Sequence, residues 1–150
     1  MSGGWQAVDD YIAGKLLGED DALAAALLNN AAKGLPPIDV SAAQGKMLFL
    51  LAQIAGAKHI LEVGTLGGYS TICLARALPE NGRLVTLELD PHHAAVAREN
   101  LERAGVSGKV DIRVGPAADS LAAMSPDAPL DFVFIDADKQ GNAHYVAEAI

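Results

Sequence analysis

Four short apolar segments in the last two thirds of the chain alternate with amphipathic stretches of helical spacing. The apolar segments cover residues 59–63, 83–88, 110–114 and 131–136. The stretches between them predict helices near 69–78, 91–104 and 116–124, with another that begins near 140. Alternation of strand and helix over such distances favours right-handed crossovers and a parallel sheet covered on both faces. The sequence therefore predicts an α/β fold with a doubly wound parallel sheet.

The first third of the chain has a helical pattern without strands. Asp20 or Asp21 can cap a second helix, and Ser41 stands three residues before Gln44, the spacing of a capping box that begins a third. We interpret Trp5 and the leucines of these helices as packing residues, and we expect the third helix to carry its apolar residues on one face, namely Met47, Leu48, Leu51 and Ile54. We predict a single domain over 1–150, with residues 1–56 as a helical N-terminal extension and 57–150 as the core.

The C-terminal part of the sequence predicts a sheet from which further strands are missing. Four parallel strands are few for such a fold, and the run from Phe132 to Ile135 is too apolar for a comfortable exposed edge. Ile150 falls within an apolar helical pattern that no Gly, Asn or Pro ends. We therefore expect a core that is incomplete at its C-terminal side, with a fourth strand unpaired on its open side.

Charge and cysteine content narrow the function. The formal net charge is -8 at pH 7, and an acidic chain with scattered basic residues repels phosphate backbones and anionic lipid. We expect no nucleic-acid partner and no membrane partner, whereas a cationic small molecule would suit this charge. Cys73 is the only cysteine, so no intramolecular disulfide can form, and we interpret it as a small buried residue. With no signal-peptide pattern visible, we expect a cytoplasmic protein.

A glycine-rich turn follows the first predicted strand, at residues 64–68. Glycines between a buried strand and a helix allow a ligand to approach the backbone closely, and tight packing of the strand on the helix is the alternative explanation. The second glycine of the dinucleotide fingerprint is missing, because Thr65 and Leu66 follow Gly64. This disfavours a pyrophosphate ligand. Glu88 ends the second predicted strand, where an acidic side chain of this fold accepts hydrogen bonds from ribose hydroxyls, while Asp90 is better placed to cap the next helix.

The fourth predicted strand delivers two carboxylates and an ammonium at its carboxyl end. Asp136, Asp138 and Lys139 follow it directly, in the place where open α/β sheets bind ligands. A carboxylate can hold a hard divalent cation, and a lysine can act as a base. A helix-capping salt bridge is the alternative. We interpret His92 and His93, in the first turn of a helix, as solvated.

Taken together, these blocks resemble the cation-dependent O-methyltransferases, the S-adenosylmethionine (SAM) enzymes that include caffeoyl-CoA and catechol O-methyltransferases. The resemblance rests on the run 62–70, Glu88, the Ala104-Gly105 and Gly115-Pro116-Ala117 turns, the run 134–139 and Tyr145. It implies a Rossmann-like class I methyltransferase fold. It also implies cofactor-binding roles for Val40, Glu62, Gly64, Thr65, Ser70, Glu88, Ala117, Asp138 and Tyr145.

The same resemblance implies that Asp136 is a metal ligand, for a divalent cation such as Mg²⁺, and that Lys139 is the catalytic base. The family's other two metal ligands, an adjacent Asp-Asn pair, are expected beyond Ile150. The implied reaction is methyl transfer to a hydroxyl of a small phenolic or catechol-like substrate, in a protein that can form a homodimer. Two alternatives stay open at this point: a SAM-binding module without turnover, and an NAD-dependent oxidoreductase.

Overall fold

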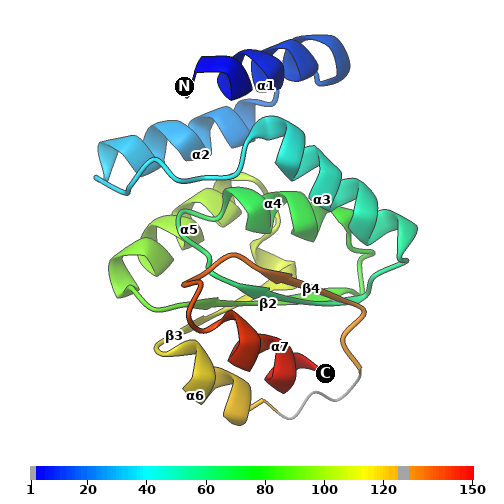
Figure 1. Cartoon of the computed structure of the whole chain (residues 1–150), viewed down its shortest axis with the longest axis vertical. Helices are drawn as coiled ribbons and strands as arrows, with labels where there is room; N and C mark the ends of the chain where they lie inside the picture. The colour runs from blue at the N-terminus through cyan, green and yellow to red at the C-terminus, as the bar shows by residue number, and fades with distance from the viewer. Residues whose placement is uncertain (1–2, 125–128) are drawn as a thin grey trace.

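The computed structural model describes residues 3–124 and 129–150. Three helices come first, followed by strands and helices in alternation (Figure 1). The helices are α1 (Gly3–Leu16), α2 (Asp21–Ala32), α3 (Ala42–Ile54), α4 (Tyr69–Ala77), α5 (Pro91–Arg103), α6 (Ala117–Ala122) and α7 (Asn142–Ala149), with a short 3₁₀ helix at Ser107–Lys109. The strands are β1 (His59–Val63), β2 (Arg83–Glu88), β3 (Val110–Val114) and β4 (Phe132–Ile135).

The four strands form one parallel sheet in the order β3-β2-β1-β4. Helices α4 and α5 cover one face, with α2 and α3 outside or beside them, while α6 and α7 cover the other face (Figure 1). The predicted doubly wound α/β fold is confirmed, and the predicted strands agree with the observed ones to within one residue at each end. Strand β4 is an edge strand, and among the described residues nothing pairs with its outer side, as expected from the small number of strands and the apolar run that forms it.

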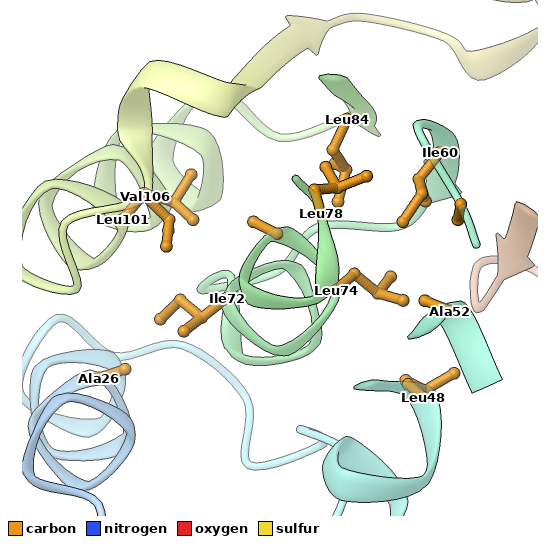
Figure 2. Packing of buried hydrophobic residues seen from close by; sticks show 12 residues of the cluster. Ala26, Leu48, Ala52, Ile60, Ile72, Leu74, Leu78, Leu84, Leu101 and Val106 are labelled. Atoms are coloured by element: carbon orange, nitrogen blue, oxygen red, sulfur yellow. The ribbon is translucent and has the colours of Figure 1, made fainter. Parts of the chain in front are cut away.

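Alternation along the strands divides the core in two. Ile60 of β1 and Leu84 of β2 point toward α3, α4 and α5, where they join Ile72 and Leu74 (Figure 2). The odd-numbered positions of the same strands, such as Leu61 and Leu87, pack on the opposite face against α6 and α7. Each face is therefore buried by its own set of helices, which leaves the carboxyl ends of the strands as the part of the sheet open to a ligand.

Helix caps agree with the local sequence. Asp20 accepts a hydrogen bond from the Leu23 amide at 3.0 Å and caps α2. Ser41 and Gln44 form the predicted capping box, with the Gln44 amide donating to Ser41 Oγ at 3.2 Å and the Ser41 amide donating to Gln44 Oε1 at 2.9 Å. Asp90 caps α5 through the His92 amide at 2.7 Å. These caps set where α2, α3 and α5 begin.

The packing predicted for the N-terminal helices is wrong in part. Trp5 is 79% exposed, and Leu16 and Leu28 are also exposed. On α3 only Leu48 of the four predicted apolar positions is buried; the buried face instead carries Gly45 and Ala52, and Met47, Leu51 and Ile54 are exposed. The physical reason lies at Gly45, where a Cβ atom would stand 2.9 Å from Cys73 Sγ and 3.1 Å from Tyr69 Cε1. Helix α3 meets α4 through small residues, so its larger ones face outward.

Within the described residues, none of the helices has the length and apolar character needed to cross a lipid bilayer. Cys73 is buried, as predicted, and burial raises the pKa of its thiol to about 12. It therefore behaves as a small packing residue of α4.

Candidate cofactor site

A cavity of about 530 Å³ opens at the carboxyl ends of the strands. Along the chain, β1, β2 and β3 run outward to one edge, and β4 returns to pair with the other side of β1, so the strand order reverses between β1 and β4. A crevice at such a switch point is where open α/β sheets bind ligands. The cavity is lined by the segment 38–40, the turn 64–66, the start of α4, residues 87–89, the start of α6 and residues 136–138, with His93 and Tyr145.

The turn after β1 needs its glycines. Gly64 has a φ of 101°, a conformation that side chains rarely adopt, and a Cβ atom there would stand 2.2 Å from the Asp136 carbonyl oxygen. The ends of β1 and β4 can therefore approach only because residue 64 is glycine. Gly68, with a φ of 85°, is the N-cap of α4 and has no side chain to place over the helix amides.

Glu88 organises the same turn from the end of β2. Its Oε2 accepts hydrogen bonds from the amides of Thr65 at 3.0 Å and Leu66 at 2.8 Å, and its Oε1 accepts one from the Asp90 amide at 3.0 Å. The side chain is almost fully buried yet reaches the cavity wall. Each carboxylate oxygen can accept more than one hydrogen bond, so Glu88 can hold the turn and still accept from a ligand hydroxyl.

Glu62 lies behind the cavity wall. It points from β1 toward α4 and is 0% exposed. Three hydroxyls donate to its carboxylate: Ser70 at 2.6 Å, Thr71 at 2.6 Å and Thr86 at 2.7 Å. Burial, the largest effect, raises its pKa to about 7 against the opposing hydrogen bonds. Glu62 itself is not among the described residues that line the cavity, and it reaches the cavity through neighbouring hydroxyls such as that of Ser70, so its role in cofactor binding stays a prediction.

Asp136 and Asp138 follow β4 and both line the cavity. Asp138 accepts from the Tyr145 hydroxyl at 2.6 Å and from the Gly141 amide at 2.7 Å. The Tyr145 hydrogen bond, followed by that of Gly141, lowers the pKa of Asp138, and the same contact raises the pKa of Tyr145. Strand β4 and helix α7 are thus joined at the cavity. Lys139 is exposed, and it is not one of the described residues that line the cavity.

The remaining predicted cofactor residues also converge here. Val40, Thr65, Ser70 and Ala117 line the cavity, although they come from four different parts of the chain. The Thr65 hydroxyl lies 2.7 Å from the Thr86 hydroxyl. Since the Thr86 hydroxyl already donates to Glu62, Thr65 is the donor in that pair, and the hydroxyls form a chain from the turn to the buried carboxylate.

Asp39 and His93 are two of the lining residues that sequence reasoning missed. Asp39 stands on the loop before α3, where the adjacent prolines gave no sign of a site, and burial raises the pKa of its carboxyl. His93 was interpreted as solvated, which is wrong. Its side chain is 22% exposed and lines the cavity, with Nδ1 3.5 Å from Glu88 Oε1. The only sequence feature that could have placed His93 at the site is its position in the first turn of α5. That position does not distinguish a solvated side chain from one that faces the strand ends.

The charge of the wall selects among ligands. Four carboxylates line the cavity, those of Asp39, Glu88, Asp136 and Asp138, and within the described part of the chain no lysine or arginine lines it. Such a wall disfavours a pyrophosphate and favours a ligand that carries positive charge. It therefore argues against a dinucleotide cofactor, consistent with the missing glycine of the dinucleotide fingerprint.

For a metal ion, the described residues offer a partial set of ligands. No group of three or more His, Cys, Asp or Glu side chains among them could hold a metal ion. Asp136 provides one carboxylate at the cavity, and Mg²⁺ commonly takes only one or two carboxylates while it keeps several waters. Asp136 thus fits the role of one protein ligand.

Comparisons with known proteins agree with this geometry. The family model described as O-methyltransferase matches residues 17–150. A catechol O-methyltransferase of Niastella koreensis is 53% identical over 148 residues, which are 97% of this chain and 67% of that protein. A catechol O-methyltransferase of Mycobacterium tuberculosis is 54% identical, over 95% of this chain and 64% of that protein.

A solved structure is also similar throughout. The O-methyltransferase from Bacillus cereus in complex with SAH matches with a TM-score of 0.96 at 52% identity, over 99% of this chain and 69% of that one. The chain therefore spans about two thirds of the length of these relatives. Since the family model covers all of the sheet and of the cavity wall, the chain belongs to the O-methyltransferase family.

Proposed function

We propose that this protein is a SAM-dependent O-methyltransferase that methylates a hydroxyl of a small catechol-like or phenolic substrate with the assistance of a divalent cation. The observation that carries the proposal is the acidic cavity at the switch point between β1 and β4, with Glu88 at the end of β2. SAM carries a sulfonium and an α-ammonium, which suit this wall. The bound SAH of the similar Bacillus cereus structure, and the names of the two catechol O-methyltransferases, support the same assignment.

In this proposal the chain's own residues do three things. Glu88 accepts hydrogen bonds from the ribose hydroxyls while it keeps the turn 64–66 in place. Ser70, held by Glu62, and Val40 bind the methionine part, and Ala117 contacts the adenine. Asp138, fixed by Tyr145, completes the wall at the end of β4. Together these residues would hold the cofactor in the cavity beside Asp136, which lies at the end of β4.

The reaction itself is a displacement at the methyl carbon. The substrate oxygen forms a bond to that carbon, the carbon–sulfur bond breaks, and sulfur retains the electron pair to give S-adenosylhomocysteine. The phenol proton, lost from a group with a pKa near 10 in water, passes to Lys139 Nζ. A divalent cation bound at Asp136 would stabilise the substrate anion. Holding oxygen and methyl carbon in line supplies much of the rate enhancement.

The decisive experiment measures binding and turnover separately. Isothermal titration of the chain with SAM, SAH and NAD should show binding of the first two and none of NAD. Incubation with SAM, catechol and Mg²⁺, followed by mass spectrometry, should yield monomethylated catechol. NAD binding without SAM binding would refute the proposal in favour of an oxidoreductase. SAM binding without product would favour the alternative of a SAM-binding module. The cytoplasmic location and the homodimer stay predictions.

A further inference from the structure

Two buried asparagines link the N-terminal helices to the cofactor cavity. Asn30 of α2 is 3% exposed and Asn100 of α5 is 1% exposed. Asn100 Nδ2 donates to Asn30 Oδ1 at 2.9 Å and to the Gly67 carbonyl oxygen at 2.8 Å. Buried amides must be fully paired to avoid a large desolvation cost. These two amides are paired with each other and with the glycine turn that follows β1.

The orientation of the Asn100 amide follows from its other partners. Its Oδ1 accepts from Asn29 Nδ2 at 2.9 Å and from an Arg103 guanidinium nitrogen at 3.0 Å. With two donors directed at that oxygen, the Nδ2 group must face Asn30 and Gly67. Asn30 Oδ1 is consequently the acceptor, which leaves its own Nδ2 as a donor.

That donor reaches a second part of the cavity wall. Asn30 Nδ2 donates to Asp39 Oδ1 at 3.0 Å, and Asp39 lies in the segment 38–40 that lines the cavity. Asn30 therefore contacts two separate parts of the site at once. One is the turn after β1, through Asn100 and Gly67, and the other is the loop before α3, through Asp39.

The glycine turn is shaped to admit this side chain. A Cβ atom at Gly67 would stand 2.0 Å from Asn30 Oδ1 and 2.2 Å from both Asn30 Cγ and Asn30 Nδ2. The backbone conformation at residue 67 does not require glycine, because Gly67 is not among the glycines with a positive φ. Glycine is needed at residue 67 because the Asn30 amide occupies the space that a side chain would fill.

We propose that Asn30 is a positioning residue for the cofactor, which holds the Asp39 carboxylate and the glycine turn at the spacing that SAM requires. The inference rests on the proposed function, since it takes SAM as the ligand. It gives helix α2 a part in cofactor binding beyond its packing on α4 and α5. If the role were packing alone, an apolar residue would serve at lower desolvation cost.

The test exchanges the amide of residue 30 and the carboxylate of residue 39, first one at a time and then together. Asn30→Asp keeps the shape but places a second carboxylate beside Asp39, and it should weaken SAM binding by about tenfold or more, as expected for loss of a hydrogen bond to a charged group. Asp39→Asn retains an acceptor for Asn30. In the Asp39→Asn background, Asn30→Asp restores a donor and acceptor pair, so it should cause less than about a threefold further loss in titration calorimetry.

A matched control separates positioning from stability. Ala26 is fully buried on α2, one turn before Asn30, and faces Ile72 of α4 (Figure 2). Ala26→Gly should lower the unfolding midpoint, because glycine weakens a helix relative to alanine, yet leave the SAM dissociation constant unchanged below that midpoint. Asn30→Ser, which shortens the donor without adding charge, replaces Asn30→Asp if that variant does not fold, and the same loss is expected.

The outcomes are distinct. If the Asn30 variant binds SAM with wild-type affinity, the positioning role is overturned while the proposed function stands. The same conclusion follows if Asn30→Asp lowers SAM affinity equally with and without Asp39→Asn. A loss of SAM affinity in Ala26→Gly as large as that in the Asn30 variant also overturns it, since stability would then explain both. Failure of the wild-type chain to bind SAM refutes the proposed cofactor and this role together.

Discussion

Glu88 combines two kinds of contact in one side chain. Its carboxylate holds the amides of Thr65, Leu66 and Asp90, and in our proposal it also binds the ribose. Glu88→Ala should weaken SAM binding by roughly 1.5–3 kcal/mol, the range for hydrogen bonds to a charged group. Titration calorimetry measures this, with Glu80→Ala as a control that removes an equal charge from an exposed loop. Unchanged affinity in Glu88→Ala would exclude the role.

Glu62 should make stability depend on pH. Its pKa is raised from 4.5 to about 7 by burial. Between these values the folded state holds a proton that the unfolded state has released, so the free energy of unfolding falls as pH rises toward 7. The loss is on the order of 1–3 kcal/mol, since each pKa unit corresponds to about 1.4 kcal/mol. Glu62→Gln has no such proton to lose.

Urea denaturation at pH 5, 6 and 7 tests this at residue 62. The free energy of unfolding should decline more steeply with pH in the wild type than in Glu62→Gln, whatever the difference in their absolute stability. Parallel profiles for the two proteins would show that Glu62 does not titrate in this range.

Asp136 and Lys139 are expected to have separable roles. Asp136→Ala should abolish the Mg²⁺ dependence together with most activity, and should leave SAM binding largely intact. Lys139→Ala should lose turnover by about 10²–10⁴-fold, the usual contribution of a positioned base, with partial recovery at high pH where the phenol ionises unaided. Steady-state rates of the two variants, with Lys15→Ala as the control, test both roles. If Lys139→Ala keeps wild-type turnover at pH 7, Lys139 is a surface residue and not the base.

At the scale of elements, the junction of β1 and β4 depends on Gly64. Gly64→Ala introduces both a strained φ and a clash with the Asp136 carbonyl oxygen, 2.2 Å from the added Cβ. Gly105 also has a positive φ, 71°, but among the described residues no atom beyond its chain neighbours lies within 4 Å of a Cβ placed there. We expect Gly105→Ala to cost about 1–2 kcal/mol of strain alone, and Gly64→Ala to cost more and to impair SAM binding.

Denaturant titration of both glycine variants gives the comparison. If they were equally destabilised and bound SAM equally well, the approach of β4 to the turn after β1 would not matter for the site. The same pair of variants therefore separates backbone strain from the closeness of two strand ends.

At the scale of the whole molecule, ligand binding should stabilise the fold. A ligand present at 100 times its dissociation constant stabilises the folded state by about 2.7 kcal/mol. For a chain of this size, that raises the unfolding midpoint by about 5–10 °C. Differential scanning fluorimetry with SAM and SAH should show such shifts, and NAD at the same concentration should show none. A shift with NAD and none with SAM would contradict the cofactor assignment.

The local sequence determined the elements and their order. Apolar runs of four to six residues and helical spacing between them predicted each strand of the described residues, and caps such as Ser41 with Gln44 predicted where helices begin. These features depend on neighbours within a few residues, so they can be seen without the fold. The resemblance of the blocks around Gly64, Glu88 and Asp136 was sufficient to indicate the family.

The tertiary structure alone decided which side chains meet. It placed Glu62 behind Ser70 and not in the cavity, brought His93 beside Glu88, and put Asn30 against both Gly67 and Asp39. It also turned the small residues of α3 inward and left Trp5 exposed. Some of these contacts join residues that are far apart in the sequence, such as Asn30 and Gly67, and all of them depend on how helices pack on the sheet. The sequence pattern of a segment predicts which of its faces is apolar, but it does not predict which residues that face will contact in the folded chain.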